Sequence, residues 1–164
     1  MTILSKLQCL DASFVESASL SAILYPTQVV ITTEKDEYVF SLNYYASWVK
    51  IYPYKRECQD FVVFVFGATS VSTYMVASSG IVKQLSSLSV KSRISVFDFY
   101  DGILAIAMIG ISFTPSPLVD GVVQLWSLQE AVWKPLGIQQ IVTCRVTGIS
   151  IQKYPLVVIG ISFV

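Results

Sequence analysis

Short apolar runs separated by turn residues follow one another along almost the whole chain. The runs are rich in Val, Ile and Thr, which favour strands, and Gly, Pro, Asp and Ser stand between them. Only residues 5–20 carry a pattern that suits a helical turn or two. The pattern therefore predicts an all-β fold with strands in 27–33, 37–43, 47–52, 60–67, 72–78, 80–88, 93–99, 102–110, 121–128, 141–150 and 154–163.

Residues 94–128 contain the clearest supersecondary pattern. An alternating strand runs into Asp101-Gly102, a tight-turn dipeptide, and a nearly wholly apolar strand follows. After a loop with two prolines, Asp120-Gly121 opens a strand that ends in Leu125-Trp126-Ser127. We expect a turn at Asp120-Gly121, with Val123 and Leu125 in the core and Trp126 near the strand end.

This order of strands resembles a repeat of the WD-repeat β-propeller family. "ISVFDF", "ILAIAM" and "VVQLWS" match the first, second and third strands of such a repeat. Ser127 stands where the family has an aspartate, and the chain has no Gly-His dipeptide because it has no histidine. Weaker copies place second and third strands in 29–43, third and fourth strands in 73–88, and first and second strands in 141–164. The apolar second strands then begin near Val29, Phe61, Ile103 and Leu156.

What the resemblance implies is a partial β-propeller of stacked antiparallel sheets. A blade needs about 40–45 residues, so the chain holds roughly three and a half. We expect one all-β unit over 1–164, the N-terminal part of a propeller, with blades at 17–52, 53–90, 92–137 and, incomplete, 138–164. A small β-barrel or sandwich is the alternative fold.

The composition fits strands that are buried on both faces. The chain is 54% hydrophobic and 13% charged, with a mean hydropathy of +0.63. The runs "VVFVF", "ILAIAMI" and "LVVI" lack alternation, which is typical of strands covered on two sides. The uncharged segments 61–82 and 102–119 keep a polytopic membrane protein as an alternative, but polar residues and prolines divide both into strand-length runs.

The residue types argue against catalysis. Without histidine, His-based acid–base catalysis and His-metal sites are excluded. Asp98, Asp101 and Asp120 stand at expected turns or strand ends, where carboxylates serve turn geometry. We therefore expect no enzyme activity, no cofactor and no metal site. The charges, 11 basic and 11 acidic, form no basic face for nucleic acid.

The cysteines and the aromatic residues carry the remaining expectations. Cys9, Cys58 and Cys144 lie far apart in the sequence. We expect them to be free thiols and the protein to occupy a reducing intracellular compartment, the cytoplasm or the nucleus. Tyr, Trp and Arg are the usual anchors of protein interfaces. The candidate partner-binding residues are Tyr44, Tyr45, Trp48, Tyr52, Tyr54, Lys55, Arg56 and Trp133.

The last apolar run is the candidate open edge of the fold. We expect residues 154–164 to pair with a strand, from another chain or from elsewhere in this one, through Leu156, Val157, Val158, Ile159, Ile161 and Phe163. The expected function is a non-catalytic protein–protein interaction scaffold within a larger assembly, whose protein partners complete or cap the propeller. A polytopic membrane protein and a small β-barrel ligand carrier are the alternatives.

Overall fold

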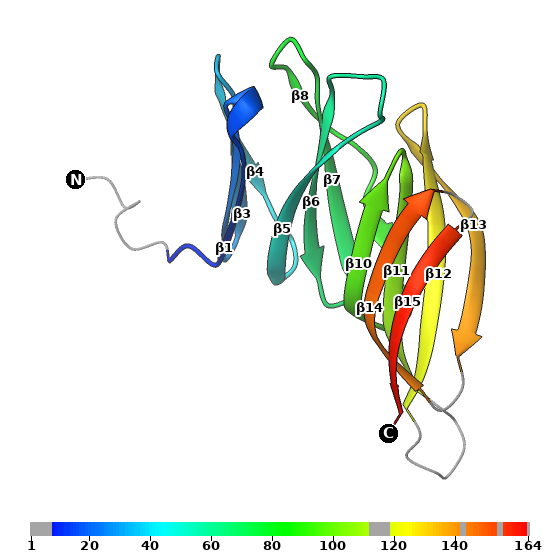
Figure 1. Ribbon diagram of the computed structural model, residues 1–164. Helices are drawn as coiled ribbons and strands as arrows, with labels where there is room; N and C mark the ends of the chain where they lie inside the picture. The colour runs from blue at the N-terminus through cyan, green and yellow to red at the C-terminus, as the bar shows by residue number, and fades with distance from the viewer. Residues whose placement is uncertain (1–7, 112–118, 142–143, 154–155, 164) are drawn as a thin grey trace. The chain divides into compact units, whose positions relative to one another are not determined.

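The computed structural model describes residues 8–111, 119–141, 144–153 and 156–163, and it is built almost wholly of strands (Figure 1). Among these residues the only helical element is the short 3-10 helix η2 (Glu16–Ala18), so the predicted all-β class is confirmed. This 3-10 turn lies in 5–20, where a helical turn or two was expected, and the strands β1 (Asp11–Val15) and β2 (Leu20–Tyr25) flank it.

The strands form four antiparallel sheets in which consecutive strands lie side by side. Sheet A contains β1, β2, β3 (Gln28–Thr32) and β4 (Glu37–Ser41). Sheet B contains β5 (Ala46–Pro53), β6 (Phe61–Gly67), β7 (Ser70–Val76) and β8 (Val82–Gln84), and the short β9 (Leu88–Ser89) follows it. Sheet C contains β10 (Arg93–Tyr100), β11 (Ile103–Ile111), β12 (Val119–Gln129) and β13 (Val132–Ile141). Sheet D contains β14 (Cys144–Lys153) and β15 (Leu156–Phe163).

The chain divides into two compact units, each built of two sheets. Unit 1 comprises residues 1–53 and 58–87 and holds sheets A and B. Unit 2 comprises residues 54–57 and 88–164 and holds sheets C and D. Repeated antiparallel sheets of this kind are compatible with a propeller-like arrangement.

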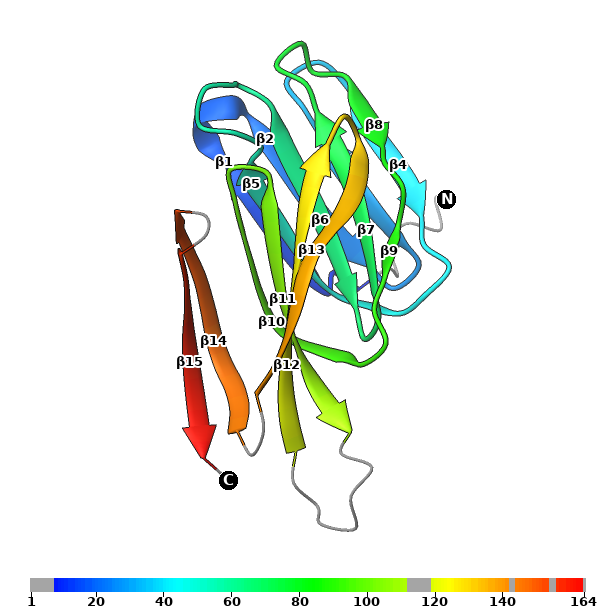
Figure 2. The ribbon, with the colours of Figure 1, turned by 90° about the vertical axis from the view of Figure 1, so that its right-hand side faces the viewer.

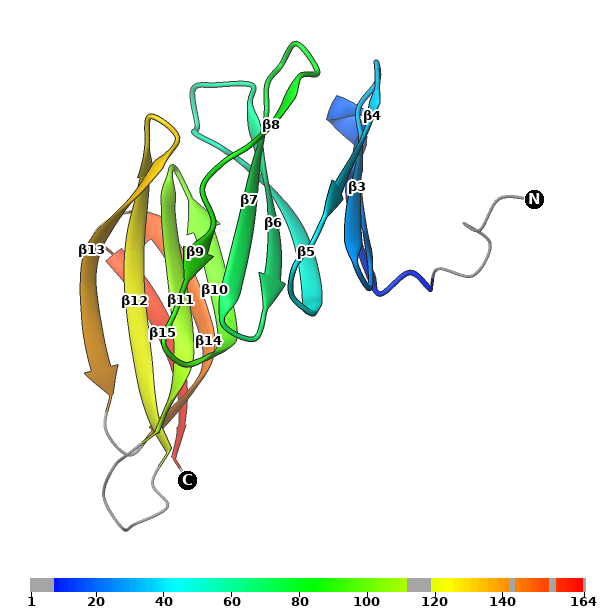
Figure 3. The same cartoon turned by 180° about the vertical axis from the view of Figure 1, so that it is seen from behind.

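In each unit the first strands of the two sheets lie against one another. Strand β1 contacts β5 in unit 1, and β10 contacts β14 in unit 2, where Figure 2 shows them running alongside. Figure 3 shows β11, β12 and β13 of sheet C side by side. The core of unit 1 is formed by apolar residues of both sheets: Leu20, Ala22, Leu24, Val29, Ile31, Ala46, Val49, Val63, Val65, Tyr74, Val76 and Val82. The smaller core of unit 2 centres on Ala107, Val123 and Val146.

Two of the three unbroken apolar runs are buried on both faces, as expected. Consecutive residues of a strand point to opposite faces. Residues 62–66 of β6 and residues 104–107 of β11 all have exposed fractions of 0%. The expectation is wrong for "LVVI" in β15, where Val158 is 51% exposed, because the described residues place no element over that side chain.

The two Asp-Gly dipeptides have different conformations. Asp101 (φ 49°) and Gly102 (φ 83°) form the expected two-residue turn between β10 and β11. Asp120 and Gly121 lie within β12, opposite Gly110 and Ile109, so the turn predicted there is wrong. The β11–β12 ladder continues as far as the pair Ile111–Val119, and this pairing keeps the dipeptide extended.

Inward-facing positions of β12 only partly follow the prediction. Val123 is buried with an exposed fraction of 4%, as expected, whereas Leu125 and Trp126 are half-buried. The register between β12 and β13 shifts between Leu125 and Trp126, which interrupts the alternation expected of an even strand.

The expected strand order holds for three sheets and fails for sheet A. Phe61, Ile103 and Leu156 begin β6, β11 and β15, the second strands of their sheets. Val29 lies in β3, so residues 29–43 contribute third and fourth strands rather than second and third. The misassignment arises because β1, "DASFV", carries a charge and small polar residues and does not look like an apolar run.

Candidate functional site

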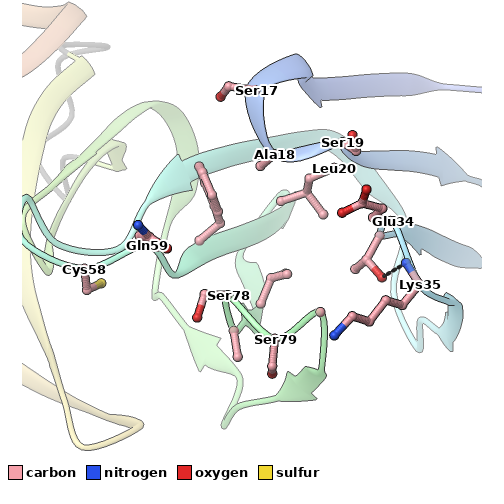
Figure 4. A pocket seen from close by; sticks show the side chains of 15 residues that line it. Ser17, Ala18, Ser19, Leu20, Glu34, Lys35, Cys58, Gln59, Ser78 and Ser79 are labelled. Atoms are coloured by element: carbon pink, nitrogen blue, oxygen red, sulfur yellow. Dashed lines mark hydrogen bonds between the residues drawn. The ribbon is translucent and has the colours of Figure 1, made fainter.

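Four connections of unit 1 meet around a cleft of about 630 Å³ (Figure 4). They are η2 with the residues that follow it, the β3–β4 turn, the residues before β6, and the β7–β8 turn. Three apolar residues, Leu20, Phe61 and Val76, are buried or half-buried and form its floor. Its rim consists of exposed polar side chains: Ser17, Ser19, Glu34, Lys35, Gln59, Ser78 and Ser79.

The β3–β4 turn is held by the side chain of Thr33. The Thr33 Oγ1 atom accepts hydrogen bonds from the backbone N–H groups of Lys35 (3.3 Å) and Asp36 (3.1 Å). The Thr33 N–H donates to the Asp36 carbonyl at 2.9 Å. These local bonds fix the turn and leave the charged side chains of Glu34 and Lys35 exposed on the rim.

The β7–β8 turn is fixed from both of its sides. Gly80 has φ of 89°, a conformation that favours glycine, and its N–H donates to the Ala77 carbonyl at 2.8 Å. The Gly80 carbonyl accepts a hydrogen bond from the Tyr38 phenol at 3.3 Å. The Ser78 N–H donates to the Asp60 carboxylate at 3.0 Å, which ties this turn to the residues before β6.

The cleft is suited to binding a short peptide segment. Its apolar floor can receive a nonpolar side chain, and the hydroxyl and amide groups of the rim can exchange hydrogen bonds with a peptide backbone. The rim carries one carboxylate, Glu34, and one ammonium group, Lys35. Across the described part of the chain, His, Cys, Asp and Glu form no group of three that could hold a metal ion. Among the same described residues, no helix is long and apolar enough to cross a bilayer.

Two of the candidate aromatic residues are packed within unit 1. The Tyr44 phenol donates to the Val65 carbonyl at 2.9 Å, and its oxygen lies 2.7 Å from Ser72 Oγ. Burial raises the pKa of Tyr44, an effect that its hydrogen bonds with Ser72 partly offset. Tyr52 meets Phe64 edge to face, with ring centroids 5.9 Å apart. Both rings therefore have structural partners.

Tyr44 also closes over the end of β6. A Cβ atom built on Gly67 would lie 2.6 Å from Tyr44 Cδ2 and 3.0 Å from the Tyr45 carbonyl oxygen. No methyl group fits in that space without movement of the ring. Tyr45 itself is 89% exposed and Trp48 is 37% exposed, so these two side chains form the accessible part of the set in unit 1.

The remaining candidates belong to unit 2. The Tyr54 phenol donates to the Leu128 carbonyl at 3.2 Å, and Lys55 Nζ lies 5.2 Å from the centroid of the Tyr54 ring. The Arg56 N–H donates to the Asp101 carboxylate at 3.2 Å, so Asp101, besides its place in the β10–β11 turn, holds a residue distant in the sequence. Trp133 is buried, with an exposed fraction of 8%. The predicted set is thus divided between the two units, and its role in binding a partner stays a prediction.

The candidate open-edge strand pairs within the chain. Every residue of β15, 156–163, has a partner in β14, and residues 154, 155 and 164 lie outside the described residues. Ile159 packs on the core of unit 2, whereas Val158 and Ile161 are 51% and 44% exposed. Val157 is half-buried, and the side chains of Leu156 and Phe163 lie outside the described ranges.

Two carboxylates that join neighbouring sheets were missed by the sequence analysis. Asp98 lies within β10 rather than at a turn, and its Oδ2 atom accepts a hydrogen bond from the Ile151 N–H of β14 at 2.8 Å. In unit 1, Asp11 Oδ2 of β1 accepts one from the Val49 N–H of β5 at 3.0 Å. Aspartate is depleted in strands, so an aspartate within a strand could have indicated a hydrogen-bonding role of this kind.

Comparison with known proteins adds no family: no protein-family model matches this sequence, and a search of curated proteins gives no significant match. The role of the chain is therefore argued from its own geometry.

Proposed function

We propose that this protein is a non-catalytic protein–protein interaction scaffold of WD-repeat-like propeller architecture, which acts within a larger intracellular assembly. The observation that carries the proposal is the cleft of about 630 Å³ at the meeting point of four connections in unit 1. Loops on a rigid sheet framework are where binding residues concentrate. The sheets position the loops, and the loops supply the surface for a partner.

The framework supports this role because the contacts between sheets repeat. Asp11 and Asp98 each lie on the first strand of a four-stranded sheet, and each accepts from a backbone N–H of the first strand of the next sheet. In both units a carboxylate–amide hydrogen bond thus joins the first strands of two successive sheets, which supports one recurring structural unit. It takes the place of the His–Asp network that the WD-repeat resemblance would imply and that this chain cannot form.

Sheet C supports the finer resemblance to a WD repeat. Its strands follow in the order β10, β11, β12 and β13, and the segment Leu125-Trp126-Ser127 lies near the end of the third strand. The hydroxyl of Ser127, whose exposed fraction is 5%, stands in place of the family's aspartate. It lies 3.2 Å from the Gln129 side-chain amide, which donates to it.

The chemistry of the cleft favours a peptide segment as the bound group. Its lining has a buried apolar floor and several hydroxyl groups on an exposed rim. A segment with one nonpolar side chain between backbone amides satisfies both surfaces. The two opposite charges at Glu34 and Lys35 leave the rim without a preference for a strongly charged partner.

Photocrosslinking in the native cell tests the proposal. A photoreactive amino acid is placed at Ser78 on the rim, and at Lys83, an exposed residue of β8 outside the cleft, as the control. We expect a discrete protein adduct from position 78 and none from position 83. The adduct should disappear when Ser17→Trp narrows the cleft from the opposite side (Figure 4). Equal adducts at both positions, or none at position 78, would contradict the proposal.

A further inference from the structure

The cleft of unit 1 is closed at one end, where the β3–β4 turn touches the β7–β8 turn. A Cβ atom built on Gly80 would lie 3.4 Å from Lys35 Cδ, 3.7 Å from Lys35 Cβ and 3.5 Å from Thr33 Oγ1. At the same contact the Tyr38 phenol donates to the Gly80 carbonyl at 3.3 Å. Since Gly80 follows β7 of sheet B and the other residues lie in or beside β4 of sheet A, this contact joins the two sheets at the end of the cleft.

The sides of the cleft away from this contact are lined by Ser17 of η2 and by Gln59, which precedes β6 (Figure 4). Both side chains are exposed. A segment that enters between Ser17 and Gln59 and lies along the floor meets the two touching turns at the far end. It cannot continue between them, so the bound segment has to stop or leave the cleft at Lys35.

The floor of the cleft is the outer layer of the hydrophobic core of unit 1. Leu20 and Val76 are core residues with exposed fractions of 3% and 4%, and Ala18 and Phe61 pack against the same core. Leu20 belongs to sheet A, whereas Phe61 and Val76 belong to sheet B, so a nonpolar side chain placed on the floor contacts both sheets. Such a side chain extends the core, and the floor therefore selects a nonpolar residue.

The one positively charged side chain that lines the cleft lies at its closed end. The Lys35 stem rests on Gly80, and the side chain runs towards Ser79 (Figure 4). The one carboxylate of the lining, Glu34, points the other way, towards Ser19 (Figure 4). An ammonium group beside a hydroxyl group can hold a carboxylate through charge-assisted hydrogen bonds. The closed end is therefore suited to a carboxylate of the bound segment.

We propose that the cleft binds the carboxyl terminus of a partner protein, with a nonpolar last side chain on the floor and the terminal carboxylate at Lys35. This inference rests on the proposed function and names the part of the partner that the cleft receives. A chain terminus needs no passage between the touching turns, and it carries its negative charge where the chain stops. The site asks for one carboxylate at one place, which agrees with a rim that has no preference for a strongly charged partner.

The closed end favours a chain terminus over an internal acidic side chain. An internal aspartate or glutamate also supplies a carboxylate, but its chain continues and has to leave the cleft over the rim beside the same lysine. A terminal residue carries its carboxylate and its side chain on one Cα atom. This arrangement suits a cleft of about 630 Å³ whose lining includes both the ammonium group of Lys35 and the apolar floor.

Binding of peptide pools to the 164-residue chain tests the proposal. Each pool consists of fluorescein-labelled hexapeptides with five degenerate positions and a fixed last residue, made both as the free acid and as the carboxy-terminal amide. Fluorescence anisotropy gives the dissociation constants. We expect pools that end in leucine or phenylalanine to bind about fivefold or more tightly as free acids than as amides, and pools that end in serine or lysine to bind more weakly in both forms.

Lys35→Met identifies the side chain that holds the carboxylate. This change should bring the ratio of the two dissociation constants to about one, because acid and amide then meet the same uncharged side chain. The matched control is Lys83→Met, which removes the same charge from an exposed residue of β8 outside the cleft and should keep the ratio. Ser17→Trp, which narrows the cleft, should weaken the binding of both forms. Circular dichroism confirms that each variant keeps its strand content.

Four outcomes would overturn the proposal. They are equal affinities for free acids and amides, a ratio that Lys35→Met leaves unchanged, no binding of any pool, and tighter binding of amidated pools with an internal aspartate than of the free acids. The photocrosslinked adduct at position 78 is a separate measurement, because it reports whether a protein occupies the cleft by any of its segments. The proposed function and this inference can therefore fail independently.

Discussion

The Asp98 carboxylate of β10 accepts a hydrogen bond of 2.8 Å from the Ile151 N–H of β14, 53 residues further along the chain. The bond joins sheet C to sheet D, and Asp11 makes the same kind of bond to Val49 between sheets A and B. Both carboxylates are half-buried, where an amide without a partner is costly. These two side chains connect strands that no backbone ladder joins.

Removing the carboxylate of Asp98 should lower the free energy of unfolding. Asp98→Ala leaves the Ile151 N–H without its acceptor, and we expect a loss of about 1–3 kcal/mol by urea denaturation. Asp98→Asn keeps an acceptor oxygen and should lose less. Asp36→Ala is the control, because Asp36 is exposed and holds its turn through backbone groups. Equal losses in the alanine variants would show that the bond does not stabilise the fold.

Adding one methyl group at Gly67 should destabilise unit 1. The new Cβ atom would lie 2.6 Å from Tyr44 Cδ2, so the ring would have to move away from its hydrogen-bond partners. We expect Gly67→Ala to cost about 1–3 kcal/mol, the range for overpacking. Thermal unfolding with Gly137→Ala as the control checks this, since nothing lies within 4 Å of a Cβ at position 137. A neutral Gly67→Ala would contradict the close approach of the ring.

The β12–β13 hairpin should become more stable when its turn receives a glycine. Glu130 (φ 49°) and Ala131 (φ 64°) both adopt left-handed backbone conformations, which cost a residue with a side chain about 1–2 kcal/mol. Ala131→Gly removes that strain, and we expect the free energy of unfolding to rise by about 0.5–1 kcal/mol, since added chain entropy in the unfolded state offsets part of the gain.

The reverse change at the equivalent turn of β10–β11 is the matched control. Gly102 has φ of 83°, so Gly102→Ala introduces the strain that Ala131→Gly relieves and should lower stability. Thermal unfolding of both variants gives the comparison. If the two changes shift stability in the same direction, the backbone conformations of these turns are not as described.

Tyr74 should make stability fall in alkaline solution. Burial, with a smaller contribution from nearby Tyr44, raises the pKa of Tyr74 from 10.0 to about 12. The unfolded state therefore releases this proton at lower pH than the folded state does. The stabilisation is fully present below pH 10 and is lost as pH rises through 10 towards 12. We expect Tyr74→Phe to flatten this part of the pH–stability curve measured by urea denaturation, whereas Tyr45→Phe, at an 89% exposed position, leaves it unchanged.

Local patterns determined which residues form strands and where several of them turn. The unbroken apolar runs of β6 and β11 indicated strands with two covered faces, because neither face could tolerate a polar side chain. Asp101-Gly102 indicated its turn because both positions need positive φ, which these residue types tolerate. Both features depend on residues close together in the sequence, and the sequence was sufficient for them.

Tertiary structure alone decided the features that join distant segments. Asp120-Gly121 has the same turn chemistry as Asp101-Gly102, yet the β11–β12 ladder holds it extended, because the pairing hydrogen bonds outweigh a local preference. The cleft of unit 1 brings together residues from 17 to 80, and the role of Asp98 depends on an amide at Ile151. The composition of the chain and the spacing of its residues do not indicate which distant residues make such contacts. They arise only when packed sheets bring separate strands within hydrogen-bonding distance.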